Sequence, residues 1–105
     1  MNQTKSKAET FLGFVLRSGK YRLGGNAIAT LKSANLLILC HTAEKNSVVT
    51  AKKLAKKFGV KIVVINHKTL ESVTGKDFCK IMAILDSSLS QAILDNLGED
   101  FTELI

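Results

Sequence analysis

The chain of 105 residues has no proline and no tryptophan, a single tyrosine and two cysteines. Because it lacks proline and any glycine- or serine-rich stretch, no segment looks like a linker, and we expect a single domain over residues 1–105. No apolar run approaches the roughly 20 residues of a membrane-spanning helix. The first seven residues also lack the apolar stretch of a secretory signal. These absences predict a cytoplasmic protein with no membrane partner.

Cysteine and histidine provide little material for a metal site or for catalysis. Cys40 and Cys79 lie in or beside apolar runs, which is typical of buried, reduced thiols, and no Cys or His pair has zinc-site spacing. We therefore expect no metal and no other cofactor. A thiol enzyme that uses Cys40, His41 and Asp86 is an alternative. Because nothing in the sequence brings these groups together, we predict that the protein is not an enzyme.

Charge is distributed unevenly along the sequence. The net charge is +6, and all 15 Lys and Arg residues lie in residues 1–80, which hold four of the nine acidic residues. Residues 81–105 hold the other five acidic residues and no base, and we expect an acidic C-terminal tail over residues 98–105. A basic body is typical of proteins that bind a polyanion, and a lysine-rich solvated surface is the alternative.

The periodicity of apolar residues predicts an α/β fold. Helical spacing connects Ala8 to Val15, Gly25 to Leu31, Ala51 to Phe58, Leu70 to Val73, and Leu89 to Leu97. The segments 36–40, 62–65 and 81–85 are apolar throughout, as strands buried on both faces are, and a short edge strand is expected at 21–23. This alternation predicts a three-layer α/β/α sandwich with a mixed, mostly buried four-stranded sheet.

The segment from Ser18 to Asn26 carries the strongest functional signal. It combines the cations Lys20 and Arg22 with three glycines and an Asn that can cap a helix. A helix that starts at Gly25 or Asn26 would present free N–H groups, which favour phosphate, and glycine allows a ligand to approach the backbone closely. Such an element suits a folded anionic backbone, and RNA is the leading candidate.

Two further features bear on RNA binding. Lys52, Lys53, Lys56 and Lys57 share the polar face of a predicted helix; they could contact phosphates, although such a face is more often simply solvated. Tyr21 and Phe78 are the aromatic residues in turn-like settings. With so few aromatic platforms, we expect recognition through backbone and shape more than through base stacking.

The order of these motifs resembles the ribosomal protein L-seven-Ae / L-thirty-e family, whose members bind kink-turns and related internal loops of RNA. The resemblance runs from about Phe11 to Leu97. It is carried by these segments: Phe11 to Gly13, Arg17 to Lys20, Leu36 to Cys40, Ala43 to Ser47, Gly59 to Ile62, Thr69 to Lys76, and Ala83 to Asp86. It implies an α/β/α sandwich that grips RNA along one edge.

The resemblance also implies which residues meet the RNA. In the family, the start of the second helix enters the RNA, and the loop after the short helix closes over a protruding nucleotide. The corresponding residues here are Gly24, Gly25, Asn26, Ala27 and Thr30 for the helix, and Val73, Thr74, Gly75, Lys76 and Asp77 for the loop. Lys20, Arg22 and Lys76 would position phosphates.

Two positions depart from the family pattern. Ala27 and Thr30 stand where the family has Glu and Lys, so a guanine-edge acceptor and a phosphate-pairing cation are missing. Each missing contact weakens binding by about 1–3 kcal/mol.

We predict an RNA-binding protein, ribosomal or ribosome-associated, that recognises a kink-turn or a similar structured internal loop. Its expected partners are structured RNA, ribosomal RNA in particular, and ribosomal proteins, and we expect a monomer when it is free. The alternative is a protein-interaction module on the same fold with weakened RNA binding, suggested by Ala27, Thr30 and the acidic end.

Overall fold

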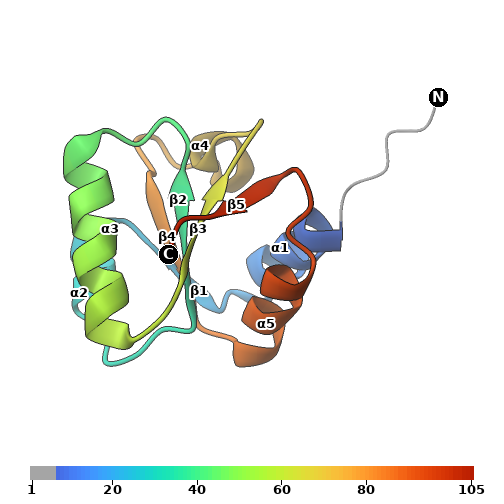
Figure 1. Ribbon diagram of the computed structural model, residues 1–105, viewed down its shortest axis with the longest axis horizontal. Helices are drawn as coiled ribbons and strands as arrows, with labels where there is room; N and C mark the ends of the chain where they lie inside the picture. The colour runs from blue at the N-terminus through green and yellow to red at the C-terminus, as the bar shows by residue number, and fades with distance from the viewer. Residues whose placement is uncertain (1–6) are drawn as a thin grey trace.

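The structure is a computed structural model that describes residues 7–105, a mixed α/β fold of five helices and five strands over that range (Figure 1). The helices are α1 (Lys7–Ser18), α2 (Gly25–Ala29), α3 (Lys45–Phe58), α4 (Leu70–Thr74) and α5 (Ser87–Asp95). The strands are β1 (Tyr21–Leu23), β2 (Leu36–Cys40), β3 (Ile62–Ile65), β4 (Ile81–Ile84) and β5 (Phe101–Glu103). No helix within residues 7–105 is long and apolar enough to cross a membrane.

The five strands form one sheet in the order β1-β4-β2-β3-β5. β2 and β3 are parallel, and the other neighbouring strands pair antiparallel. All five residues of β2 are buried, as its two-sided apolar sequence predicts. The short strand expected at residues 21–23 is confirmed as β1, at the edge of the sheet.

The prediction of four strands is wrong, because the acidic segment contributes a fifth strand, β5. Its Phe101 is 3% exposed and lies opposite Ile65, while Glu103 pairs in register with Val63. Glu103 also forms a salt bridge of 2.8 Å with Lys61 beside β3. The segment from 98 to 105 is therefore partly built into the sheet, where a tail was expected.

Buried side chains form one cluster on each face of the sheet. Leu36, Ile38 and Cys40 of β2 belong to a cluster that includes residues of α1, α4 and α5, whereas Leu37 and Leu39 belong to a cluster with residues of α2 and α3. Figure 1 shows α2 and α3 on one side of the strands and α1 and α5 on the other. Alternation along β2 thus supplies a core to both faces.

Two predicted helices end earlier than expected. α2 stops at Ala29 instead of reaching Leu31, because the hydroxyl of Thr30 donates to the carbonyl of Ala27 at 2.7 Å and caps the helix. α5 stops at Asp95 instead of reaching Leu97, because the side chain of Asn96 donates to the carbonyl of Ala92 in the last turn. Side-chain capping therefore ends these helices before their apolar spacing does.

Candidate nucleic-acid interface

The segment from Lys20 to Thr30 lies at the surface. It runs from the edge strand β1 into α2, and the side chains of Lys20, Arg22, Asn26 and Thr30 are exposed, while Gly24, Gly25 and Ala27 are half-buried. Lys20 lies 3.8 Å from Asp86, and 63% of its side chain is exposed. β5 lies at the opposite edge of the sheet, so the acidic segment does not cover this corner.

Asn26 does not cap α2, which was one of two roles expected for its side chain; the other is a contact with a base edge. Gly24 occupies the N-cap position with φ 88, a conformation that requires glycine, and its N–H donates to the carbonyl of Ile81 at 3.0 Å. Asn26 is the second helical residue, and its side chain has no hydrogen-bond partner within residues 7–105. With only five residues in α2, the helix dipole is small. Side chains therefore matter more at this corner than the sequence suggested.

A hollow of about 220 Å³ lies where the N-terminal ends of α2 and α3 meet. It is lined by Gly25, Asn26, Asn46, Ser47, Thr50 and Ile81. A Cβ on Gly25 would lie 3.1 Å from the methyl group of Thr50, so the glycine permits the close approach of the two helices. The lining residues from α3 were not predicted. The sequence feature that could have indicated them is the presence of polar residues at helical spacing in the first turns of α3.

The loop after α4 is the second predicted element. Gly75 has φ 76 and ends α4, and Lys76 and Asp77 are exposed. Val73 is half-buried and packs on the core, and the hydroxyl of Thr74 donates to the carbonyl of Leu70 at 2.7 Å while accepting from the N–H of Lys76. Val73 and Thr74 therefore shape the loop, whereas Gly75, Lys76 and Asp77 are available to a partner.

Phe78 is the most exposed large apolar side chain of the described residues. It is 89% exposed and has φ 58, whereas Tyr21 is half-buried in β1 and is not in a turn. A bulky residue with positive φ is strained, and such strain concentrates at functional positions. The Phe78 ring thus offers an exposed apolar surface in the loop that carries Lys76.

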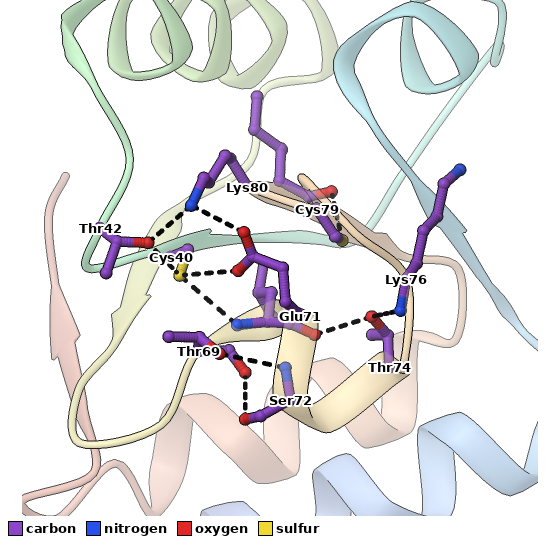
Figure 2. A network of polar contacts seen from close by, with 11 residues as sticks. Cys40, Thr42, Thr69, Glu71, Ser72, Thr74, Lys76, Cys79 and Lys80 are labelled. Atoms are coloured by element: carbon purple, nitrogen blue, oxygen red, sulfur yellow. Dashed lines mark hydrogen bonds and ion pairs between the residues drawn. The ribbon is translucent and has the colours of Figure 1, made fainter.

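An ion pair closes the base of this loop (Figure 2). Lys80, just before β4, lies 2.7 Å from the carboxylate of Glu71 on α4 and donates to the hydroxyl of Thr42 at 2.8 Å. The hydrogen bond from Lys80 holds the pKa of Glu71 below its ordinary value, and the same bond raises the pKa of Lys80. Cys40, at the end of β2, accepts a hydrogen bond from the backbone N–H of Leu70. These contacts fix where the loop leaves α4 and where it enters β4.

The groups of the alternative thiol enzyme do not converge. Cys40 is 1% exposed and its sulfur contacts Thr42 and the start of α4, whereas the ring of His41 pairs with the carbonyl of Ile65 at 3.2 Å. Asp86 caps α5 through the N–H of Leu89. Both cysteines are free and buried, and residues 7–105 hold no group of three His, Cys, Asp or Glu side chains placed to bind a metal ion.

A larger cavity, of about 360 Å³, lies between α1 and α4. Leu12, Gly13, Leu16 and Val73 line it together with an ion pair of 2.6 Å between Glu9 and Lys68. This cavity shares no lining residue with the hollow beside Asn26, so the two are separate. Of its lining residues, Val73 is the one that the resemblance places at the RNA.

Comparison with known proteins defines the class of fold. No protein-family model matches the chain, and no curated protein matches it. Among solved structures, the chain is similar to a protein of unknown function from Bacillus halodurans, with a TM-score of 0.70 and 18% identity. The match covers 87% of this chain and 96% of that one. At this identity the likeness concerns the mixed α/β fold alone.

Proposed function

We propose that this chain is a cytoplasmic RNA-binding protein, ribosomal or ribosome-associated, that recognises a kink-turn or a similar structured internal loop. It acts as a single, non-enzymatic domain on a three-layer α/β/α sandwich. The two core clusters on opposite faces of the sheet support this layering. The family resemblance supplies the class of RNA, and the arrangement of the surface residues supports the site.

The observation that carries the proposal is the meeting of the two predicted elements at Ile81. Gly24, before α2, donates its N–H to the Ile81 carbonyl, and Ile81 lines the hollow that Asn26 also lines. Ile81 is also the first residue of β4, directly after the loop that carries Lys76 and Phe78. Segments more than 50 residues apart in the sequence thus approach one another at the start of β4, which supports a shared site.

Each exposed side chain has a role that its chemistry suits. The amide of Asn26, which has no hydrogen-bond partner within residues 7–105, can both donate to and accept from a base edge. Lys20, Arg22 and Lys76 are exposed cations that position phosphates. The Phe78 ring stacks on an unpaired base, which gives the loop a stacking function beyond the closure that the resemblance implies. Bases splayed out of an internal loop offer both the edge and the face that these residues need.

The alternative of a protein-interaction module was suggested by Ala27, Thr30 and the acidic end. Phe101 to Glu103 pair with β3 and Phe101 is buried, so part of the acidic end is held in the sheet, while Leu104 and Ile105 stay exposed. Ala27 and Thr30, which lack the polar groups of the family pattern, lead us to expect moderate affinity instead.

The test is a gel-shift titration with a hairpin that contains a kink-turn and a control hairpin in which the internal loop is replaced by paired bases. We expect tighter binding to the kink-turn hairpin, with an affinity that falls linearly with salt on logarithmic axes. Equal binding to the two hairpins would refute recognition of an internal loop. Crosslinking of copurified RNA, followed by sequencing, identifies the natural target.

A further inference from the structure

Four polar residues of α3 form a continuous stripe that begins in the hollow beside Asn26. Asn46, Thr50, Lys53 and Lys57 are separated by four, three and four positions, which places them on one face of a helix. All four are exposed. Asn46 and Thr50 line the hollow, and the two lysines continue the stripe away from it. At about 1.5 Å of rise per residue, the stripe is about 16 Å long.

Contacts with α2 at both of its ends show which way this α3 stripe faces. Thr50 lies against Gly25 at the start of α2, and Lys57 donates to the carbonyl of Ala29 at its end, at 2.7 Å. Lys53 lies between Thr50 and Lys57 in the same stripe. The α3 stripe therefore runs beside α2, with its polar end in the proposed RNA site and its basic end beyond that site.

The lysines of α3 form no salt bridge with an acidic residue within residues 7–105. The salt bridges within residues 7–105 involve Lys20, Lys61, Lys68 and Lys80, none of which lies on α3. α3 carries five lysines and no acidic residue, and the one acid at its boundary is its N-cap, Glu44. Like charges at i, i+4, as at Lys53 and Lys57, repel one another in the free protein. A polyanion that follows the stripe relieves this repulsion.

We propose that Lys53 and Lys57 bind the phosphates of a duplex RNA arm that leaves the internal loop held at Asn26. This inference rests on the proposed function and extends its site along α3. Lys53 and Lys57 are four residues apart, or about 6 Å along the helix axis, a span that suits contacts with neighbouring phosphates of one strand. Double-stranded RNA is bound mainly through such backbone contacts. Lysine is suited to this role because it neutralises phosphates without reading sequence.

The same helix provides a matched control. Lys52 and Lys56 have the same i, i+4 spacing and are exposed, but they lie outside the α3 stripe. The double variants K53Q/K57Q and K52Q/K56Q remove equal charge from one helix. They remove charge from different faces of the helix, and K57Q also removes the bond between Lys57 and Ala29. K53Q alone leaves the bond between Lys57 and Ala29 intact and separates phosphate binding from any change in the packing of α2.

The experiment measures the affinity of each variant for the kink-turn hairpin over a range of salt, with the duplex arms long or, in turn, trimmed to a few base pairs. With long arms, we expect the negative slope of log affinity against log salt to become shallower by about 2 for K53Q/K57Q and by about 1 for K53Q, with little change for K52Q/K56Q. Trimming one particular arm removes the difference between K53Q/K57Q and the parent.

Two results would overturn the inference. If the two double variants have equal slopes, α3 contributes only net charge. If the effect of K53Q/K57Q survives the trimming of either arm, the two lysines do not contact a duplex arm. In both cases the parent still prefers the kink-turn hairpin to the fully paired one, so the proposed function stands. A parent that binds both hairpins equally refutes the proposed function and this inference together.

Discussion

The Asn26→Ala substitution separates RNA binding from folding. The side chain of Asn26 is exposed and makes no hydrogen bond within residues 7–105, and the cap of α2 is Gly24. The substitution therefore removes no native contact, and the higher helix propensity of alanine raises the free energy of unfolding by about 0.5 kcal/mol. For a domain of this size we expect a rise in Tm of about 2–4 °C.

Loss of a base-edge contact acts in the opposite direction on binding. It costs about 1–3 kcal/mol, which corresponds to roughly 5- to 150-fold in the Kd for the kink-turn hairpin. The assay is a fluorescence-anisotropy titration of that hairpin, paired with a thermal melt of the free protein.

Asn35→Ala is the matched control for this prediction. Asn35 is also exposed, and its backbone N–H donates to the carbonyl of Ile84, at the opposite end of β4 from Ile81. We expect no change in the Kd for N35A. Equal affinity of N26A and N35A would refute the assignment of Asn26, and a marked drop in the Tm of N26A would show that its side chain has a structural role instead.

Three further predictions concern the loop and the sheet edge. We expect Phe78→Ala to weaken binding of the hairpin by about 1–3 kcal/mol through loss of the proposed stacking on a base, without lowering Tm because the ring is 89% exposed. Phe78→Trp should retain binding, and equal affinity of the alanine variant contradicts the stacking role. Phe101→Ala lowers the free energy of unfolding by about 3–5 kcal/mol in urea titrations, while the hairpin affinity of the folded fraction stays constant because β5 lies at the far edge. Glu71→Gln lowers Tm at neutral pH, because it removes the ion pair with Lys80. Lys80 lowers the pKa of Glu71 from 4.5, so the stabilisation by this ion pair is present above pH 4.5 and is lost as the pH falls through the lowered pKa. The Tm difference between E71Q and the parent should therefore vanish in acid, and a difference that persists there contradicts this role of the ion pair.

The central part of the fold could be predicted from sequence because its signal is strong and local. β2, β3 and β4 are short runs of apolar residues at every position, and such runs are unambiguous when helical periodicity flanks them. The predicted end of α3 at Phe58 is also confirmed, and Gly59 follows it in the left-handed conformation, with φ 68.

The fifth strand could not be predicted, for a physical reason. β5 has three residues, and only Phe101 among them is buried. Its strand conformation comes from pairing with β3, a contact between residues nearly 40 positions apart. Propensity and periodicity describe neighbours in sequence, so a strand that depends on one distant partner leaves no local signal.

The candidate site shows the same division. Lys20, Arg22 and the glycines could be identified as candidates from the sequence, because charge and the lack of a side chain are properties of single residues. The hollow beside Asn26 depends instead on how closely α3 approaches Gly25, and the exposure of Phe78 depends on the backbone turn that Glu71 and Lys80 hold at its base. Relations between segments of this kind become visible only in three dimensions.

α2 is far shorter than the roughly 12–15 residues at which an isolated helix becomes marginally stable in water. It persists because Ile28 is fully buried against the β-sheet and α3. The proposed RNA-binding surface thus depends on global folding, so a defect in the hydrophobic interior lowers the fraction of protein that presents this surface. Conversely, a saturating ligand raises the melting temperature by mass action, which makes thermal-shift screening a direct route to its natural target.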